Sequence, residues 1–299
     1  MSLLGRRGRA ACGHGARRSA APERHPIGRG YPAPTTRIMV NTLSLAACVG
    51  WVRKGILAMI ISNTKRFVIL APWKTASQTI HHRFRQYNDS PYPCFYYLNK
   101  YLNRVVHQHI TCAEFACLPE SNLGYHLAAF VRNPYDRVYS GFRQLQVDIQ
   151  NQPFATFSEP WVRDLIMSQL AENFSQLCQA SFQFDAWFAL VRDEQVYEVG
   201  RNSSFPLHPA YYWTHIANSK VVNFIGKIEN FENDLETLTS RVGIDNLESG
   251  NLNIVDIVGR SLENPFGYRY LHLMNSSSIT KINRLFSNDF EQFAYEQIT

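Results

Sequence analysis

The stretch from Phe67 to Tyr87, FVILAPWKTASQTIHHRFRQY, constrains the fold more than any other part of this chain. It opens with a continuous apolar run at 67–70, which is typical of a strand buried on both faces of a parallel sheet. Pro72 then ends the ladder, because proline has no N–H to donate. After Lys74 the apolar residues recur at the spacing of an amphipathic helix, at Ile80, Phe84 and Tyr87. The stretch therefore predicts a strand, a tight loop and a helix.

The loop of this unit has the chemistry of an anion-binding site. Between a strand and a helix, free backbone N–H groups and the positive end of the helix dipole point at one place. Lys74 adds a full positive charge, and hydroxyl donors follow at Thr75, Ser77 and Thr79. No glycine occurs between residues 67 and 87, so the G-x-x-x-x-G-K-[ST] order of nucleotide triphosphatases is missing. The loop is a phosphate cradle of another kind.

Charge divides the chain into a basic leader, residues 1–58, and a folded body, residues 59–299. The leader holds ten Lys and Arg against one acid, so its net charge is +9. The body holds 20 Lys and Arg against 23 acids, which gives −3 and argues against nucleic acid as a partner. A body of this length with 45% hydrophobic residues overall is long enough to bury a sizeable core.

The leader allows two interpretations. Residues 1–37 are rich in Arg, Gly, Ala and Pro, and we expect them to be disordered. The apolar segment 38–52 has 15 residues, too few to span a bilayer comfortably. We favour a dispensable leader and a cytoplasmic protein; the alternative is a Golgi-type membrane anchor, the one route by which we expect membrane association. Six cysteines without a C-x-x-C pair favour reduced thiols and leave one or two disulfides open.

A second strand-to-helix unit follows at residues 127–145. The apolar run 127–131 leads into Arg132, and Asn133 and Pro134 suit the N-cap and the first position of a helix. Seven residues make about two helical turns, so Ser140 shares a face with Asn133 and converges with Arg132 on one small anion. With a third run at 221–225, the pattern predicts an α/β fold, a three-layer α/β/α sandwich with a central parallel sheet.

Several segments resemble PAPS-dependent sulfotransferases. K-T-A-S-Q-T-I at 74–80 resembles their 5′-phosphosulfate loop, with Ala76 in place of the usual Gly and Gln78 in place of the usual Thr. F-V-R-N-P-Y-D-R-V-Y-S at 130–140 resembles their 3′-phosphate signature almost position for position. F-I-G-K-I-E-N-F at 224–231 and the terminal acidic-aromatic segment 287–295 are similar to later family segments. The resemblance covers about 64–297 and points to the carbohydrate-type, family-2-like branch, with its P-loop-NTPase-like fold.

The resemblance implies how the donor PAPS (3′-phosphoadenosine 5′-phosphosulfate) is held. Arg132 and Ser140 would bind the 3′-phosphate, since the guanidinium fork donates two parallel hydrogen bonds. Tyr268 and Arg269 would border the nucleotide. Lys74 would stabilise charge on the leaving oxygen during in-line transfer, and we expect no metal requirement. The 5′-phosphosulfate would lie against Lys74, Thr75, Ala76, Ser77, Gln78 and Thr79.

A hydroxyl acceptor needs a general base as its oxygen attacks sulfur. In the family a histidine lies between the two phosphate motifs, and His109 matches its position. We expect a short strand at 105–110 that points His107 and His109 the same way, which keeps His107 as the reserve base. His81 and His82 are expected on the surface of their helix. A metal pair of His107 and His109 lacks a third ligand at metal-site spacing.

The function predicted from the sequence is therefore sulfuryl transfer from PAPS to a hydroxyl of a carbohydrate or small-molecule acceptor. A nucleotide kinase on a related fold is the first alternative, although the G-K-[ST] loop is missing. A catalytically inactive protein that binds PAP or PAPS is the second, and the departures at Ala76 and Gln78 leave it open. The sequence does not name the acceptor.

Overall fold

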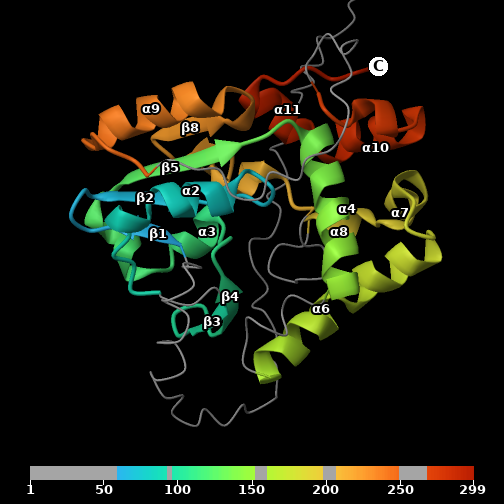
Figure 1. The fold of residues 1–299 in the computed structure, drawn as a ribbon, viewed down its shortest axis with the longest axis horizontal. Helices are drawn as coiled ribbons and strands as arrows, with labels where there is room; N and C mark the ends of the chain where they lie inside the picture. Colours follow the sequence, from blue (N-terminus) through green and yellow to red (C-terminus); the bar gives the residue numbers. More distant parts are fainter. Residues whose placement is uncertain (1–58, 93–95, 152–159, 198–206, 249–267) are drawn as a thin grey trace, which may run out of the picture. The chain divides into compact units, whose positions relative to one another are not determined.

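The main sheet has four strands in the order β1-β2-β5-β8 (Figure 1). The computed structural model describes residues 59–92, 96–151, 160–197, 207–248 and 268–299, so the leader 1–58 lies outside it. Strands β2, β5 and β8 are parallel, as predicted, and β1 adds an antiparallel edge. The strands are β1 (Ile60–Ser62), β2 (Phe67–Leu70), β5 (His126–Val131) and β8 (Phe224–Lys227).

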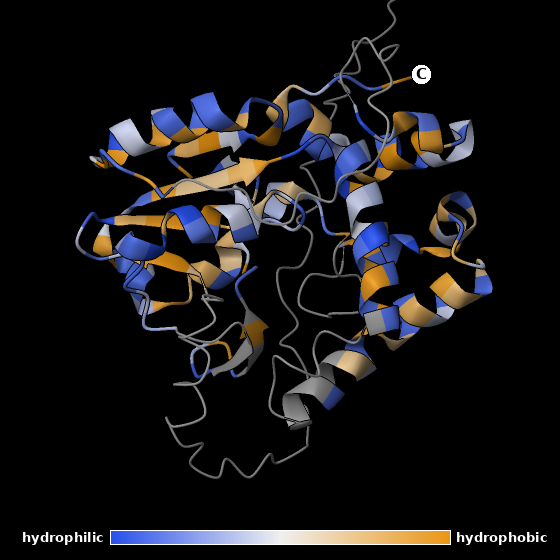
Figure 2. Cartoon of the chain, viewed as in Figure 1, coloured by the Kyte–Doolittle hydropathy of each residue, from blue (hydrophilic) through white to orange (hydrophobic). Residues whose placement is uncertain are grey.

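Alternate residues of the central strands face two separate cores. Phe67 and Ile69 of β2 pack with Phe130 of β5 against helices α2 (Ser77–Arg83) and α9 (Phe231–Val242). Val68 and Leu70 belong to the larger core on the opposite face. Helices on both faces of an apolar sheet (Figure 2) confirm the α/β/α sandwich.

Seven helices contribute side chains to the larger core. Their apolar stripes enclose the face of the sheet that carries Val68 and Val131. They are α3 (Cys112–Phe115), α4 (Pro134–Asn151), α6 (Pro160–Gln179), α7 (Phe184–Leu190), α8 (Asp193–Tyr197), α10 (Ser276–Leu285) and α11 (Ser287–Phe293). Within the described ranges, no helix is long and apolar enough to cross a bilayer.

Two short hairpins lie outside the main sheet. One pairs β3 (Tyr96–Asn99) with β4 (Arg104–His107), and the other pairs β6 (His215–Ile216) with β7 (Ser219–Lys220). The strand expected at 105–110 thus ends at His107. The reason is that Thr111 already begins α3 with a capping box to Glu114, which leaves residues 108–110 as a link.

In the part of the chain that the structure describes, five short 3-10 turns connect the larger elements. Their bounds are η1 (Arg85–Tyr87), η2 (Pro119–Leu123), η4 (Ala210–Trp213), η5 (Ile228–Asn230) and η6 (Leu271–Leu273).

The third parallel strand begins three residues later than predicted. Val221 still belongs to the exit of the β6–β7 hairpin, where its N–H donates to the Thr214 carbonyl. The strand then runs through Gly226, where a Cβ atom would lie 2.5 Å from the Phe130 ring. This close approach explains the glycine in the F-I-G-K segment, because any side chain there would displace a core aromatic.

The register of the parallel pairs defines the functional edge of the sheet. Leu70 of β2 lies beside Ala129 of β5, so both strands end at the same edge. There β2 leads into α2 and β5 leads into α4 (Figure 1). Ligands of open α/β sheets bind outside the carboxyl ends of the strands, which makes this edge the place to look for a site.

Candidate active site

The anion loop, residues 71–79, follows β2 and has a strained backbone. Lys74 and Ala76 both have left-handed conformations, with φ of 62° and 56°. Ala76 is the N-cap of α2, so the position where the resembling family has glycine requires a glycine-like φ here. Left-handed turns of this kind point successive N–H groups into a concavity that suits an anion.

The side chains of the anion loop differ in their burial. Thr75 is fully buried, and its hydroxyl donates to the Pro72 carbonyl at 2.8 Å. That hydroxyl proton therefore holds the loop together, so the Thr75 hydroxyl has no proton to donate to a ligand in this conformation. Thr79 is buried in α2, whereas Ser77 is half-buried and Gln78 is exposed.

Arg132 stands at the end of β5 with its guanidinium only loosely paired. Its Nη2 lies 3.5 Å from Oδ2 of Asp136, and its guanidinium carbon lies 5.6 Å from the centre of the Tyr270 ring. Asp136 also accepts the Tyr270 N–H at 3.0 Å through Oδ1. The Tyr270 ring in turn stacks on Tyr139 of α4. Asp136 and Tyr270 thus orient Arg132 and leave donors of its fork for another acceptor.

Sequence reasoning singled out Tyr268 and Arg269 and missed their neighbour Tyr270, which is the residue that contacts Arg132. Tyr268 is buried, and its hydroxyl donates to the Glu296 carbonyl at 3.3 Å. Arg269 is exposed. Ser140 is half-buried in the second turn of α4, where the helical spacing placed it.

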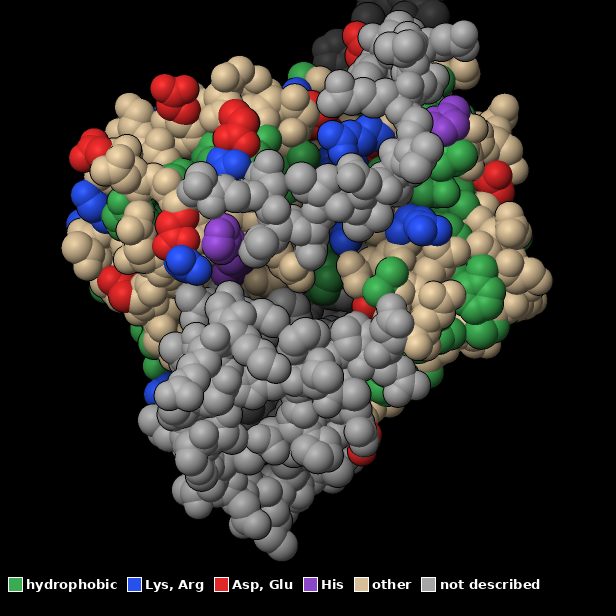
Figure 3. All heavy atoms as spheres, viewed as in Figure 1, with side chains coloured by type: hydrophobic (Ala, Val, Ile, Leu, Met, Phe, Trp, Pro, Cys, Tyr) green, Lys and Arg blue, Asp and Glu red, His purple; other side chains and the backbone are tan. Residues whose placement is uncertain are grey.

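The positive charge of Arg132 acts on Lys74 of the anion loop. Burial, together with the positive charge of Arg132, lowers the pKa of Lys74 to about 8. Two like charges held near each other in a poorly solvated place are unfavourable until an anion joins them. The anion loop and the Arg132 motif therefore form one positive site at the edge of the sheet. On the face shown in Figure 3, Lys and Arg side chains gather over the start of α4.

A hydrogen-bonded chain connects Lys74 to the third and fourth turns of α4. Lys74 Nζ donates to Oε1 of Gln144 at 3.0 Å, and Gln144 Nε2 donates to Oδ1 of Asp148 at 2.7 Å. Asp148 is buried, and burial raises its pKa to about 6. Sequence reasoning missed both residues. The available signal was their four-residue spacing from Ser140, which places all three on one face of α4.

His109 lies beyond β4 and is anchored against the anion loop. Its Nδ1 lies 2.6 Å from the Ala71 carbonyl, and its Nε2 lies 3.0 Å from Nε2 of Gln108. A carbonyl only accepts, so Nδ1 carries the proton and Nε2 is the basic nitrogen of the neutral ring. The ring also stacks on Trp73 of the anion loop at 3.8 Å. The face alternation expected for His107 and His109 does not apply, because the strand ends at His107.

His81 is buried, which corrects the expectation that it lies on the helix surface. Thr79, Ile80 and His81 are consecutive buried residues of α2, so this two-turn helix is covered on more than one side. Burial lowers the pKa of His81 to about 3 and keeps the ring neutral.

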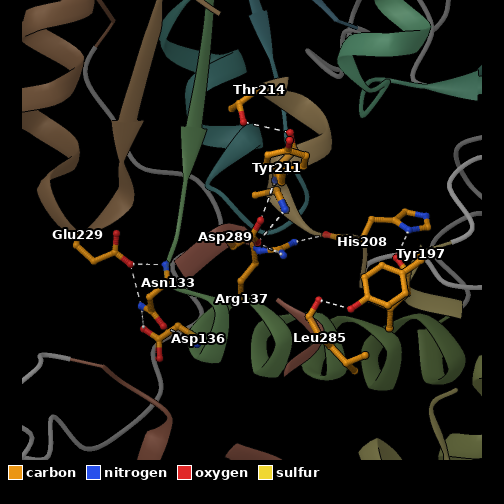
Figure 4. Close-up of polar contacts among 12 residues, drawn as sticks. Asn133, Asp136, Arg137, Tyr197, His208, Tyr211, Thr214, Glu229, Leu285 and Asp289 are labelled. Atoms are coloured by element: carbon orange, nitrogen blue, oxygen red, sulfur yellow. Dashed lines mark hydrogen bonds and ion pairs between the residues drawn. The ribbon is translucent and has the colours of Figure 1, made fainter. Parts of the chain in front are cut away.

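The later motifs hold the start of α4 in place. Asn133 caps the helix as predicted, with its Oδ1 accepting the Asp136 N–H at 2.8 Å, and Pro134 is the first helical residue. Glu229, from the segment after β8, accepts both the backbone and the side-chain N–H of Asn133 at 2.8 Å (Figure 4). Its other oxygen accepts the Tyr295 hydroxyl at 2.9 Å. These contacts join three sequence motifs into one support.

Arg137 belongs to a second, fully buried network (Figure 4). Its Nη2 contacts Asp289 of α11 at 2.9 Å, outside its own helix. Its Nη1 donates to the His208 carbonyl at 2.7 Å. Asp289 also accepts the N–H groups of Ala210 and Tyr211 at 2.9 and 2.8 Å. The network ties α4 to α11 and η4.

The described ranges contain no group of three or more His, Cys, Asp or Glu side chains arranged to hold a metal ion. No curated protein and no solved structure matches the chain. One family model does match, described as the sulfotransferase family, and it covers residues 56–296. That range contains both motifs that resemble phosphate-binding segments, the segment 224–231 and the whole terminal segment 287–295. Because the match spans well over half of the chain, this protein belongs to the sulfotransferase family.

Proposed function

We propose that this protein transfers the sulfuryl group of PAPS to a hydroxyl of a carbohydrate or small-molecule acceptor. Membership of the sulfotransferase family supports sulfuryl transfer as the reaction. The carrying observation is the placement of Lys74 and Arg132, two cations from separate motifs that follow parallel strands ending at one edge of the sheet. A nucleotide with anionic groups at both its 5′ and 3′ positions matches such a pair.

The residues of the site fit the two ends of the donor. The anion loop offers backbone N–H groups in left-handed turns and the Lys74 ammonium for the 5′-phosphosulfate. Arg132 offers its guanidinium fork for the 3′-phosphate, with the start of α4 adding the positive end of a helix dipole. Lys74 would stabilise the negative charge that grows on the phosphate oxygen as its bond to sulfur breaks.

His109 is the proposed general base. Its proton on Nδ1 is fixed by the Ala71 carbonyl, so Nε2 is available for the proton that the acceptor hydroxyl loses as its oxygen bonds to sulfur. The Gln108 amide now donates to Nε2, and an acceptor hydroxyl has to replace it. His107 remains the reserve candidate in β4.

The test is a screen of hydroxyl acceptors with radiolabelled PAPS and the full chain, followed by substitution of His109. We expect His109→Ala to lower turnover by roughly 10²–10⁴-fold while PAP affinity changes little, because the base acts on the acceptor proton. His126→Ala is the matched control, a partly buried histidine at the opposite end of β5.

Each outcome of the screen has a distinct meaning. Tight PAP binding without turnover on any acceptor would favour the inactive binding protein. Preference for ATP with magnesium over PAP would favour the kinase. Full turnover in His109→Ala with loss in His107→Ala would move the base to His107 and leave the donor site intact.

A further inference from the structure

The third and fourth turns of α4 carry polar side chains whose only described partner in the site is Lys74. Gln144 accepts from the ammonium with its amide oxygen and donates to Asp148 with its amide nitrogen. Asp148 is 4% exposed, and a carboxylate is rarely buried without a specific partner. Nothing in the two phosphate motifs uses either residue, so their presence beside the anion loop needs its own explanation.

We propose that Gln144 and Asp148 are positioning residues that hold the Lys74 ammonium, charged and aimed, at the edge of the sheet where the donor binds. The inference rests on the proposed function, since the purpose of a held ammonium is to meet the 5′-phosphosulfate. Gln144 provides the direct contact, and Asp148 fixes the orientation of the Gln144 amide by accepting its N–H.

The Gln144 amide separates the Lys74 ammonium from the Asp148 carboxylate, and this determines how strongly the ammonium is held. A direct Lys–Asp pair would neutralise the ammonium and compete with the donor for it. A neutral amide oxygen holds the ammonium by a weaker hydrogen bond, which an anionic oxygen exceeds because charge-assisted bonds are roughly twice as strong. The carboxylate still acts from a distance, since its negative charge favours the protonated form of Lys74.

Two charged groups from different elements act on Lys74 in opposite directions. Arg132, at the end of β5, lowers its pKa, and Asp148, on α4, raises it. Burial is the largest cause of the lowered pKa, the charge of Arg132 adds to it, and the resulting pKa is about 8. Asp148 therefore opposes the loss of the Lys74 proton at the upper end of the neutral range, where half-protonation would remove the charge that the reaction uses.

Helix α4 also fixes the distance between the two proposed anion sites. One continuous helix carries Ser140, proposed for the 3′-phosphate, and one and two turns later the residues that hold Lys74 for the 5′ end. A helix is a rigid spacer with a rise of about 1.5 Å per residue, so α4 sets the span between the two anion sites.

The experiment measures the Lys74 proton directly, without donor or acceptor. The full-length protein is labelled with trace acetic anhydride between pH 6 and 10, and the acetylation of Lys74 is quantified by mass spectrometry of its peptide. The wild type is expected to show a midpoint near pH 8. Asp148→Asn should move the midpoint down by at least about half a pH unit, and Arg132→Gln should move it up. Asp245→Asn, the same charge change on an exposed side chain beyond α9, should leave it unchanged.

A midpoint in Asp148→Asn that equals that of Asp245→Asn overturns the inference. If Asp148→Asn fails to fold, shown by loss of the far-UV circular dichroism of the wild type, the Arg132→Gln midpoint and Gln144→Leu decide in its place. Gln144→Leu should accelerate Lys74 acetylation at pH 9 severalfold by releasing the ammonium, and an unchanged rate counts against the proposal.

PAP titrations from pH 6 to 9 separate this inference from the proposed function. Earlier loss of PAP affinity with rising pH in Asp148→Asn than in wild type supports both. The labelling can show the expected shifts while the wild-type protein binds no PAP at any pH. That result would contradict the proposed function and still support the positioning of Lys74 by Gln144 and Asp148.

Discussion

Arg132 and Arg137 lie five positions apart in one motif, yet their guanidinium groups differ in burial and in pairing. Arg137 is fully buried, and its guanidinium is paired with Asp289 and the His208 carbonyl. Arg132 is half-buried and, among the described residues, has one ion pair at 3.5 Å and an aromatic ring beneath it. The difference teaches that one short sequence motif can contain two kinds of arginine. One is committed to the fold, and the other is held in place with donors left over.

Replacing the fold arginine should have the largest effect. Arg137→Met leaves Asp289 charged and buried without its cation, and we expect a loss of about 3–5 kcal/mol in the free energy of unfolding. Urea denaturation followed by circular dichroism measures it. Arg143→Met, an exposed arginine of the same helix, should change stability by about 0.5 kcal/mol or less. Equal losses in the two variants would remove the structural role from Arg137.

Replacing the ligand arginine should weaken binding and spare the fold. Arg132→Ala loses a charge-assisted, two-pronged contact to phosphate, which predicts a loss of about 2–4 kcal/mol in the free energy of PAP binding. Its unfolding free energy should fall by much less than that of Arg137→Met. Calorimetric titration with PAP gives the first quantity. Should Arg132→Ala bind PAP like wild type, or unfold as readily as Arg137→Met, the contrast between the two arginines would collapse.

The buried carboxyl group of Asp148, which has no direct cation partner among the described residues, should also make the stability of the protein depend on pH. Burial raises the pKa of Asp148 from its ordinary value of 3.8 to about 6 in the folded protein, so its contribution to stability is present below pH 4 and is lost as pH rises through 6. At about 1.36 kcal/mol per pKa unit, wild type should lose roughly 2–3 kcal/mol relative to Asp148→Asn between pH 4 and pH 7. Denaturation series at both pH values test this. A difference that stays constant with pH would show that Asp148 is not shifted.

The smallest expected effect concerns backbone strain in the anion loop. Ala76 has φ of 56°, a conformation that costs an L-residue roughly 1–2 kcal/mol and glycine nothing. Part of the gain is offset because glycine adds entropy to the unfolded chain. Ala76→Gly should therefore raise the free energy of unfolding by about 0.5–1 kcal/mol. The control, Ala186→Gly at an exposed position of α7, should lower it by about 1 kcal/mol. Two changes of the same sign would contradict the strain.

Local chemistry explains which features the sequence predicted. The strand-loop-helix units, the Asn133 cap and Pro134 at the first position depend on neighbours a few residues away, and all three are observed. Buried strand runs were recognisable because β2 and β5 are covered on both faces. The order of motifs led to the family, which the family model confirms.

Long-range partners explain what the sequence did not predict. Gln144 lies 70 residues from Lys74, and Asp289 lies 152 residues from Arg137. Neither partner follows from a periodicity, since each depends on how α4 packs against another part of the chain. The burial of His81 has the same origin, because the pattern of α2 identifies one apolar face and gives no sign of a second cover.

The parallel pairing of β2, β5 and β8 has a consequence for the order of events in folding. The first pairs join Phe67 to His126 and Ala128 to Phe224, so two loops of 59 and 96 residues must close before the edge exists. Closing a long loop costs conformational entropy before the new contacts can compensate for that cost, so such topologies fold slowly. We therefore expect Lys74 and Arg132 to come together late in folding. A nucleotide whose binding requires both residues would bind only the folded state. At a free concentration of a hundred times its Kd, it would add about 2.7 kcal/mol to the free energy of unfolding of the protein. If PAPS binds there as proposed, adding PAP should raise the stability of the purified protein.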